Sequence, residues 1–465
     1  MKILITAFLC YLSVFSQSIT HEQIFGTNSN GSDVKSMLSG NILLTGVNYD
    51  GPNGLSDIYL VKLDKYYNTI FEVNYGGFNN DWANSSIELE DESILVVGGT
   101  GSFSNSQSRD LMIVKFDSLG NFQQRKVYGG NNTDIANDLI KLKDGFLVTG
   151  YTESYGSGDR DAWVLRLDEN LDTLWTKTFG GDEFDDSWSV KQVNDNFYIT
   201  GGSYSYASGD LDDAWLIKFN SFGETIWIKH YGVENRIDWA WDMDITIDEE
   251  IILVGLNDSQ ESDGVPFGKL HLIKVDSDGE IIWDKSYGQE NNFRIEGTGV
   301  KTSSNGDIYI SGWRVNYSLA AVTFYMAKFD KSGEVIWEQD YFKSNEFARA
   351  NGVSFLEDNK IAYLGYSGQS QGSPQKMTLI VLDDLTSGIN SHNEVPFFPN
   401  PSSSIITIDN SNKYTNFEIY NYNGEKIDSG TIKTNFIDIT KLKIGSYFLK
   451  LSNSNSSTTI KFLKS

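Results

Sequence analysis

The chain has 465 residues, and its 37 Lys and Arg against 63 Asp and Glu give a formal net charge of −26. Recognition of nucleic acid or of an anionic membrane surface needs basic patches, so this balance excludes both functions. The single cysteine, Cys10, lies near the amino terminus, which excludes disulfides, thiolate metal sites and a cysteine nucleophile from the rest of the chain. After the first residues no apolar run reaches about 18 residues, so no membrane span is expected.

Residues 1–16, MKILITAFLCYLSVFS, combine one lysine, an apolar run and small or polar residues after it. This pattern predicts a secretory signal peptide, with cleavage after Ser16. Leu9 stands where the cleavage site of a lipoprotein requires a small residue, so we do not expect lipid anchoring through Cys10.

A repeated unit of four short strands occupies most of the chain. One strand of the unit ends in a Tyr/Phe-Gly pair, and these pairs recur along the chain at intervals of 50 to 56 residues. Each copy also has a strand in which apolar residues occupy both the odd and the even positions. This pattern is typical of a strand that is covered on both faces of its sheet. One glycine per copy ends another strand, at Gly46, Gly98, Gly150, Gly201, Gly255, Gly312 and Gly365.

Four short strands at this period predict a β-propeller, and a solenoid is the rival interpretation. The positions within the repeat unit at which the repeats begin and end favour the propeller. The chain enters with one strand of a unit at residues 19–26 and leaves near Leu385 after the other three strands. The first strand is therefore expected to complete the last of seven blades and to close the ring over residues 17–389. The prediction is an all-β chain with this ring, a 390–398 linker and a small β-sandwich at 399–465.

Several turn sequences resemble those of known propellers. DSDGEIIW at 276–283 and DKSGEVIW at 330–337 are similar to turns of quinoprotein propellers, and the strand order resembles kelch repeats. This resemblance implies the fold and no activity. Aspartates that recur at the start and at the end of one strand of the unit are explained by Asx-turn hydrogen bonds rather than by chemistry. Those at the start are Asp57, Asp110, Asp161 and Asp213, and those at the end are Asp64, Asp117, Asp168, Asp276, Asp330 and Asp383.

The last 67 residues resemble the C-terminal sorting domain of type IX secretion substrates of Bacteroidota. The matching positions, in order along the chain, are Pro399, Asn400, Pro401, Gly424, Asp438, Gly445, Tyr447 and Lys461. The resemblance implies a small β-sandwich that an outer-membrane translocon recognises and a sorting peptidase removes, with the protein secreted or held on the outer cell surface. An ordinary accessory β-domain is the alternative.

The long, variable loops all belong to one face of the predicted ring, where a ligand would meet the mouth of its channel. Tryptophans near that mouth suit sugars, because flat rings stack on the C–H faces of a sugar; they are Trp82, Trp188, Trp239, Trp241 and Trp313. Trp82, Trp188 and Trp239 begin strands, so wedging between blades is the alternative for them. Trp241 and Trp313 have no equivalents in other units and are the better ligand candidates.

Arg236, Arg294 and Arg349 enter three successive blades on the same set of loops. Convergent guanidinium groups suit a carboxylate or sulfate of an acidic glycan. The alternative is local pairing with acids such as Asp238 or Glu296.

No cofactor is predicted. The oxygen-rich loops 156–161, 207–213 and 257–264 are the candidates for structural calcium, although none of them has EF-hand spacing. Zinc is less favoured still, because the histidines are scattered along the chain, at His21, His230, His271 and His392. We expect an exported binding or interaction protein, with glycans as one ligand class. A hydrolase or lyase that uses mouth carboxylates is the first alternative, with Glu183, Asp185, Asp186, Asp238 and Asp242 as the available acids. A protein-interaction scaffold is the second.

Overall fold

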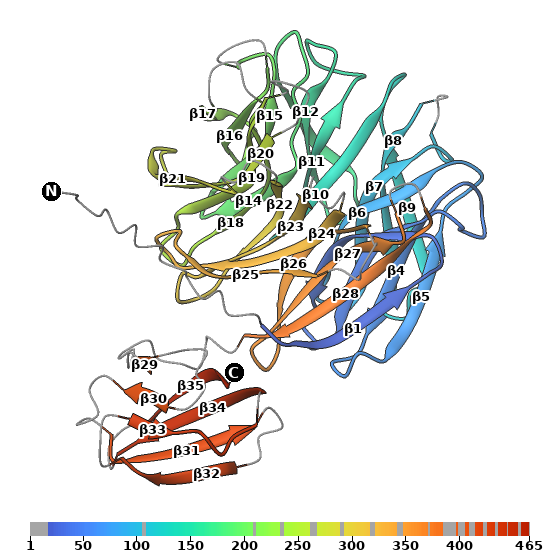
Figure 1. The fold of residues 1–465 in the computed structure, drawn as a ribbon. Helices are drawn as coiled ribbons and strands as arrows, with labels where there is room; N and C mark the ends of the chain where they lie inside the picture. The colour runs from blue at the N-terminus through green and yellow to red at the C-terminus, as the bar shows by residue number, and fades with distance from the viewer. Residues whose placement is uncertain are drawn as a thin grey trace, which may run out of the picture. The chain divides into compact units, whose positions relative to one another are not determined.

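The computed structural model describes residues 17–104, 108–207, 211–232, 237–260, 267–288, 293–316, 321–341, 347–370, 373–384, 397–398, 405–408, 414–421, 426–432, 436–443, 445–453 and 457–464. The predicted signal peptide lies outside these residues and stays a prediction. The chain forms two compact units that divide after Asp384 (Figure 1). In the part that the structure describes, the chain forms strands and turns, and it contains no helix able to cross a membrane.

The first unit is built from four-stranded antiparallel blades. The first four blades have the following strands: β2 (Ser29–Ser36), β3 (Ile42–Asn48), β4 (Asp57–Leu63) and β5 (Thr69–Tyr75); β6 (Asp81–Glu88), β7 (Ile94–Thr100), β8 (Asp110–Phe116) and β9 (Phe122–Tyr128); β10 (Asp134–Leu142), β11 (Gly145–Thr152), β12 (Asp161–Leu167) and β13 (Thr173–Phe179); β14 (Ser189–Val193), β15 (Asn196–Ser203), β16 (Asp213–Asn220) and β17 (Thr225–Tyr231).

Three further blades follow. Their strands are β18 (Trp239–Ile245), β19 (Ile251–Gln260), β20 (Phe267–Val275) and β21 (Ile281–Tyr287); β22 (Phe293–Thr302), β23 (Ile308–Asn316), β24 (Ala321–Phe329) and β25 (Val335–Tyr341); and β26 (Phe347–Leu356), β27 (Lys360–Gly368), β28 (Gln375–Asp383) and β1 (Ile19–Phe25). The described strands thus make seven four-stranded blades, arranged around a common centre (Figure 1).

The amino-terminal strand closes the ring, as the sequence predicts. β1 pairs antiparallel with β28 through Glu22 opposite Ile380 and Ile24 opposite Thr378. Beyond that sheet, Asn351 of blade 7 donates to the carbonyl of Gly31 in blade 1 at 2.7 Å. One buried apolar cluster is shared by these two blades, so the first and last blades pack like any other pair.

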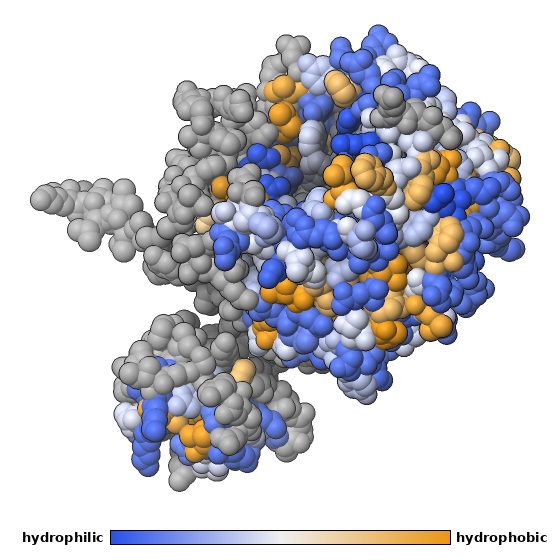
Figure 2. Space-filling model, turned by 90° about the vertical axis from the view of Figure 1, so that its right-hand side faces the viewer, coloured by the Kyte–Doolittle hydropathy of each residue, from blue (hydrophilic) through white to orange (hydrophobic). Residues whose placement is uncertain are grey.

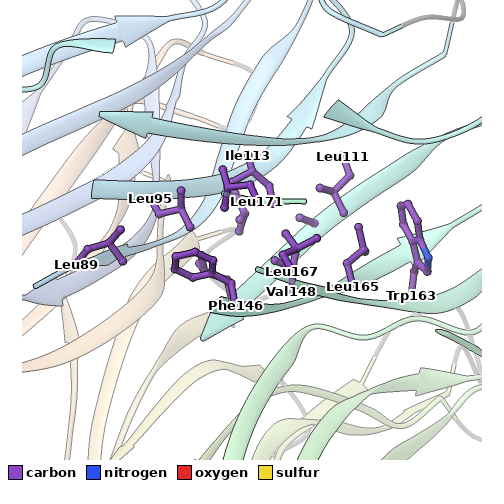
Figure 3. Close-up of a cluster of buried hydrophobic side chains, with 13 residues drawn as sticks. Leu89, Leu95, Leu111, Ile113, Phe146, Val148, Trp163, Leu165, Leu167 and Leu171 are labelled. Atoms are coloured by element: carbon purple, nitrogen blue, oxygen red, sulfur yellow. The ribbon is translucent and has the colours of Figure 1, made fainter. Parts of the chain in front are cut away.

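The core lies between blades rather than within one. Each of the seven blade–blade contacts among the described residues holds one cluster of buried apolar side chains. In Figure 3, Leu95 and Ile113 of blade 2 lie beside Phe146 and Val148 of blade 3. Burying one such side chain is worth about 1.5–3 kcal/mol, which makes these contacts the main source of the ring's stability.

The outermost strands explain the repeated turn sequence. Gly223 and Gly279 have positive φ, and a Cβ on either would lie about 3 Å from an indole of the preceding blade, Trp175 or Trp227. The closing tyrosine adds a hydrogen bond, because Tyr231 Oη donates to the carbonyl of Gly279 at 2.8 Å. The Asx-turn prediction is confirmed for the aspartates that accept two backbone N–H groups across their turns, as Asp117 does from Leu119 and Asn121; they are Asp64, Asp117, Asp168, Asp276 and Asp330.

The second unit is a β-sandwich. One sheet contains β29 (Phe397–Phe398), β30 (Ile405–Ile408) and β33 (Phe436–Asp438), and the other contains β31 (Asn416–Asn421), β32 (Lys426–Thr431), β34 (Gly445–Ser452) and β35 (Ser457–Lys464). A buried core, with Ile406 and Ile437 from the first sheet and Ile419 and Leu449 from the second, joins them. β29 pairs with β30, so Phe397 and Phe398 belong to the sheet and not to the predicted linker.

The residues behind the sorting-domain resemblance are only partly described. Pro399, Asn400, Pro401 and Gly424 lie outside the described residues. Asp438 accepts the N–H of Thr440 at 2.8 Å, and Tyr447 Oη donates to the carbonyl of Lys443 at 2.9 Å. Gly445 begins β34 and Lys461 lies in β35, so the described members support turns and strands of the sandwich.

Candidate ligand-binding channel

In six blades a β-bulge in the innermost strand turns one extra residue toward the ring's axis, and in blade 4 the equivalent residue, Trp188, lies directly before β14 and donates its N–H to the carbonyl of Thr200 at 2.8 Å. In blade 5, for example, Ala240 pairs with Gly255 and Asp242 with Val254, so Trp241 is the unpaired residue between them. The equivalent residues from blade 1 to blade 7 are Ser32, Asn84, Asn137, Trp188, Trp241, Thr298 and Asn351. All seven line one cavity of about 340 Å³.

The bulge also explains the single glycine that each repeat carries. A Cβ on Gly46, Gly150 or Gly255 would lie 1.7–1.9 Å from the carbonyl oxygen two residues before the bulge residue. No side chain fits at that separation, so the glycine is required by the backbone that builds the channel wall. Figure 2 shows the ring's surface hollowed on one side, with hydrophilic side chains within the hollow.

Polar bulge residues link neighbouring blades through hydrogen bonds. Asn84 donates to the carbonyl of Ala136 at 2.8 Å, and Asn137 donates to the carbonyl of Ser187 at 2.8 Å. Thr298 reaches the carbonyl of Ala350 at 2.8 Å in the same way. These bonds use the N–H and O–H donors, so the amide oxygens of Asn84 and Asn351 remain as acceptors at the cavity.

Blades 4 to 6 give the cavity an aromatic wall instead. Trp188 and Trp241 meet edge to face, with ring centroids 4.8 Å apart. Trp313, from the second strand of blade 6, lies on the same wall. The guanidinium of Arg349 makes a cation–π contact with it, 4.1 Å from the ring centroid. The cavity therefore has aromatic rings on one side and amide or hydroxyl groups on the other.

Glu296, which lines the cavity, is buried and pairs with an arginine. Its carboxylate is 6% exposed and accepts from Arg294 Nη2 at 3.0 Å. Burial raises the pKa of Glu296, while Arg294, Arg349 and the Trp241 indole lower it in part. The predicted pairing with Glu296 holds for Arg294, whereas Arg349 lies against the ring of Trp313, and Arg236 lies outside the described residues.

Deeper in the channel, carboxylates alternate with ammonium groups. Lys191 lies 3.5 Å from Asp138 and 3.9 Å from Asp242, and Lys35 lies 3.2 Å from Asp33. Burial alone would lower the pKa of Lys35, but the surrounding carboxylates raise it overall. Ser85 lies between Asp33 and Asp138, at 3.1 and 3.0 Å, so it links the innermost strands of the adjacent blades 1, 2 and 3.

The remaining predicted tryptophans pack between strands. Trp82 leaves no room for a side chain at Gly99 and lies 5.6 Å below Arg109. Trp239 lies over Gly202 of the preceding blade and donates to Asp212 at 3.0 Å. Neither lines the cavity, whereas Trp188, which the sequence groups with them, does.

The carboxylates proposed for catalysis have different surroundings. Asp185 is fully buried and accepts the N–H of Gly181 and the hydroxyls of Ser203 and Ser205, as Asp81 and Asp134 do in their own blades. Asp238 occupies the same position and is also buried. Asp242 lines the cavity, bound to Ser189 at 2.8 Å. Glu183 lies in the exposed loop before Asp185.

Asp186 has the most perturbed carboxyl of this group. Burial raises the pKa of Asp186 to about 6, and Gly202 N–H at 3.1 Å and Arg160 oppose that rise. Within the described ranges no group of three or more His, Cys, Asp or Glu side chains is placed to hold a metal ion. Two of the proposed calcium loops, 207–213 and 257–264, are only partly described.

Sequence reasoning missed the polar half of the channel. Ser32, Asn84, Asn137, Thr298 and Asn351 are small polar residues in strands that contain other polar residues, as in SNGSDVKS (29–36) and DWANSSIE (81–88), so polarity alone does not mark them. Their common feature is a position two residues after the carbonyl that faces the repeat glycine. Aligning the innermost strands on that glycine would have identified them.

Residues 396–465 match the family described as "Secretion system C-terminal sorting domain". The second unit is a type IX sorting domain. The protein is accordingly exported to the cell surface or the extracellular space, and the sorting domain interacts with the secretion machinery. None of the curated proteins matches the chain.

Similar solved structures include PorZ, a surface component of the type IX secretion system of Porphyromonas gingivalis, with 11% identity and a TM-score of 0.42 over 93% of this chain and 59% of PorZ. The extracellular domain of BT4673 from B. thetaiotaomicron has 10% identity and a TM-score of 0.46, over 97% of this chain and 59% of that one. The β-propeller domain of the Trilobed protease from Pyrococcus furiosus has 12% identity and a TM-score of 0.44, over 79% and 100%. The chain thus spans about three-fifths of the first two, and these similarities carry no functional argument.

Proposed function

We propose that the ring is an exported carbohydrate-binding module whose axial channel holds a neutral sugar. The observation that carries the proposal is the two-sided cavity. Trp188, Trp241 and Trp313 form one wall, and polar bulge residues form the other. Sugars suit such a site because their C–H faces stack on aromatic rings while their hydroxyls hydrogen-bond at the edges.

The charge of the lining favours a neutral ligand over an acidic one. Four carboxylates (Asp33, Asp138, Asp242 and Glu296) and four cations (Lys35, Lys191, Lys301 and Arg349) line the cavity, so their formal charges cancel. Arg294 is engaged by Glu296, and Arg314 by Glu338 and Asp340 at 2.8 and 2.7 Å. An acidic sugar would have to displace an acid from Arg294 or Arg314, or draw Arg349 away from the Trp313 ring.

The sorting domain supplies the second part of the function. We propose that the outer-membrane translocon reads residues 399–465 and that the sorting peptidase separates them from the ring. The ring then acts at the surface or outside the cell, where polysaccharides are accessible to it. This step rests on the family match alone.

Screening the full chain on an array of neutral and acidic glycans tests the proposal. We expect neutral glycans among the ligands and weaker binding by Asn351→Ala, which removes an acceptor from the polar wall. Binding confined to acidic glycans contradicts the neutral assignment. Product analysis of each ligand distinguishes binding from cleavage, and released products would favour the hydrolase or lyase.

A further inference from the structure

A second cavity of about 670 Å³ lies at the ring's circumference, between the outer strands of blades 2 and 3, far along each blade from the channel-lining strands. Tyr128 and Gly129 at the end of β9 form one side of this slot. Tyr155 and Trp163 of blade 3 form another, with ring centroids 5.5 Å apart. Thr176 and Thr178 of β13 complete it.

The same slot exists one blade earlier, where the chain fills it with its own side chain. Phe103 takes the place of Tyr155, because both rings approach an equivalent glycine, Gly77 or Gly130, at 3.3 or 3.4 Å from the position of its Cβ. Arg125 fills that slot. Its guanidinium lies 3.6 Å from the centroid of Phe103, and Nη1 donates to Tyr75 Oη at 2.8 Å.

One blade later a different planar side chain fills the equivalent slot. Tyr206 is the counterpart of Tyr155, and its ring approaches the Cβ position of Gly181 at 3.5 Å. His230 lies 5.9 Å from Tyr206 and 6.3 Å from Trp215 between ring centroids. Burial lowers the pKa of His230, so this occupant is neutral imidazole near neutral pH.

The strand register shows why the slot between blades 2 and 3 is open while its two neighbours are filled. Arg125 stands opposite Val114 in blade 2, and Thr176 stands opposite Leu165 at the same place in blade 3. Thr178 likewise matches His230, since they pair with Trp163 and Trp215. Two threonines therefore stand where the neighbouring blades carry the filling side chains.

We propose that the slot between blades 2 and 3 recognises an arginine side chain of a partner polypeptide, with its guanidinium in the place that Arg125 takes one blade earlier. This proposal does not depend on the channel.

The surroundings suit a cation. Tyr155 offers its ring face, as Phe103 does to Arg125. Tyr128 Oη donates to the carbonyl of Leu171, which leaves its lone pairs to accept from a guanidinium as Tyr75 Oη does. Lys177 also borders the slot, but its stem packs against Gly223 of the next blade.

Nearby carboxylates add to the attraction. Burial, Asp172 and Asp168 raise the pKa of Tyr128, and burial, Asp134 and Asp110 raise the pKa of Tyr155. Burial is the larger cause of both rises, and the carboxylates add a negative potential on both sides of the slot, in a chain whose net charge is −26. Such a surface attracts basic segments and repels acidic ones.

Photocrosslinking of the full chain with a benzophenone-labelled Gly-Arg-Gly peptide tests the proposal, at an ionic strength of about 0.15 M to screen distant charges. We expect crosslinks that map around Tyr155 and Tyr128. The isosteric citrulline peptide, which is neutral, should give a yield about tenfold lower. Equal yields from the two peptides overturn the proposal.

Three variants locate the site. Thr176→Arg installs the residue of blade 2 and should abolish the crosslinks around Tyr155, while Thr69→Arg adds the same charge to an exposed position of β5 and should leave them unchanged. Arg125→Thr should open the slot of blade 2 and add crosslinks around Phe103. Crosslinks that persist in Thr176→Arg, or no new crosslinks in Arg125→Thr, contradict the equivalence of the slots. Thermal melting of each variant verifies that it is folded.

Discussion

The innermost and outermost strands of the ring use repetition in opposite ways. In the outermost strands the side chains repeat, with an aromatic ring against a turn glycine and a tyrosine hydroxyl on the next blade's carbonyl. In the innermost strands the backbone repeats, through a bulge and its glycine, while the bulge side chain changes from Asn to Trp to Thr. Residues that recur at every blade therefore hold the ring together, and those that vary on a constant backbone are the ones to which we assign the proposed ligand recognition.

Breaking the inner backbone should have the largest effect. In Gly255→Ala the new Cβ would lie 1.7 Å from the carbonyl oxygen of Trp239. We expect a loss of roughly 4 kcal/mol in the free energy of unfolding, measured by urea denaturation. Gly101→Ala, with its nearest atom at 3.3 Å, is the matched control and should cost within about 1 kcal/mol. Similar costs for the two variants would show that the bulge tolerates a side chain.

Removal of an inner cation should cost more than removal of an outer one. Lys191→Met leaves Asp138 and Asp242 without their shared ammonium group, and we expect a loss of about 3 kcal/mol. Lys126→Met breaks an outer pair with Asp172 in which the lysine side chain is 39% exposed, and it should cost less than about 1 kcal/mol. Chemical denaturation at low and high salt measures both. Equal costs would contradict the contrast between inner and outer ion pairs.

The pH dependence of stability should also differ between the two regions. The pKa of Asp186 rises from 3.8 to about 6 on folding, so its ionisation opposes folding. Stability from this group is fully present below pH 3.8 and is lost as the pH rises through 6. Asp186→Asn should therefore gain about 2 kcal/mol relative to the wild type between pH 4 and pH 7, allowing for partial exposure.

At the outer turns the sign is reversed. Hydrogen bonds from Asn121 and Leu119 lower the pKa of Asp117, so its contribution to stability is lost as the pH falls. Asp117→Asn should lose stability relative to the wild type as the pH rises through the titration of Asp117. Urea denaturation across this pH range measures both variants, and the same sign of pH dependence in the two would refute the assignment.

The smallest effect is expected at a single outer hydrogen bond. Tyr231→Phe removes the bond to the carbonyl of Gly279 and should cost about 1 kcal/mol, seen as a lower melting midpoint. Tyr66, which is 71% exposed in an outer turn, provides the control, since Tyr66→Phe should leave the midpoint unchanged. A shift in the control as large as in Tyr231→Phe would mean that the interblade bond adds nothing.

The sequence predicts the ring well, because its repeated residues are the ones that build it. The glycine spacing indicates the blades, and the unpaired first strand indicates the closure that β1 and β28 provide. The repeat glycine marks where the bulge residues lie, but the bulges themselves could not be predicted, since they depend on the register between two strands. Trp188 and Trp239 therefore look alike in sequence, although only Trp188 lines the cavity.

The slot between blades 2 and 3 could not be predicted from the sequence for a related reason. Thr176 is an ordinary strand residue, and its significance appears only beside Arg125 in the equivalent slot. Similarly, Arg294 and Arg349 stand in successive repeats as the sequence indicates, but only the structure shows that Arg294 pairs with Glu296 while Arg349 lies against Trp313.

Titration of the tightest neutral glycan from the array into wild-type protein and into Trp241→Ala, by isothermal calorimetry, tests the central claim most directly. The account predicts a loss of about 30-fold in affinity for Trp241→Ala, which corresponds to about 2 kcal/mol. Trp283→Ala, which removes an outer-strand indole that packs on Gly333, should bind as the wild type does. Unchanged affinity in Trp241→Ala, or an equal loss in Trp283→Ala, would show that the sugar does not bind in the channel.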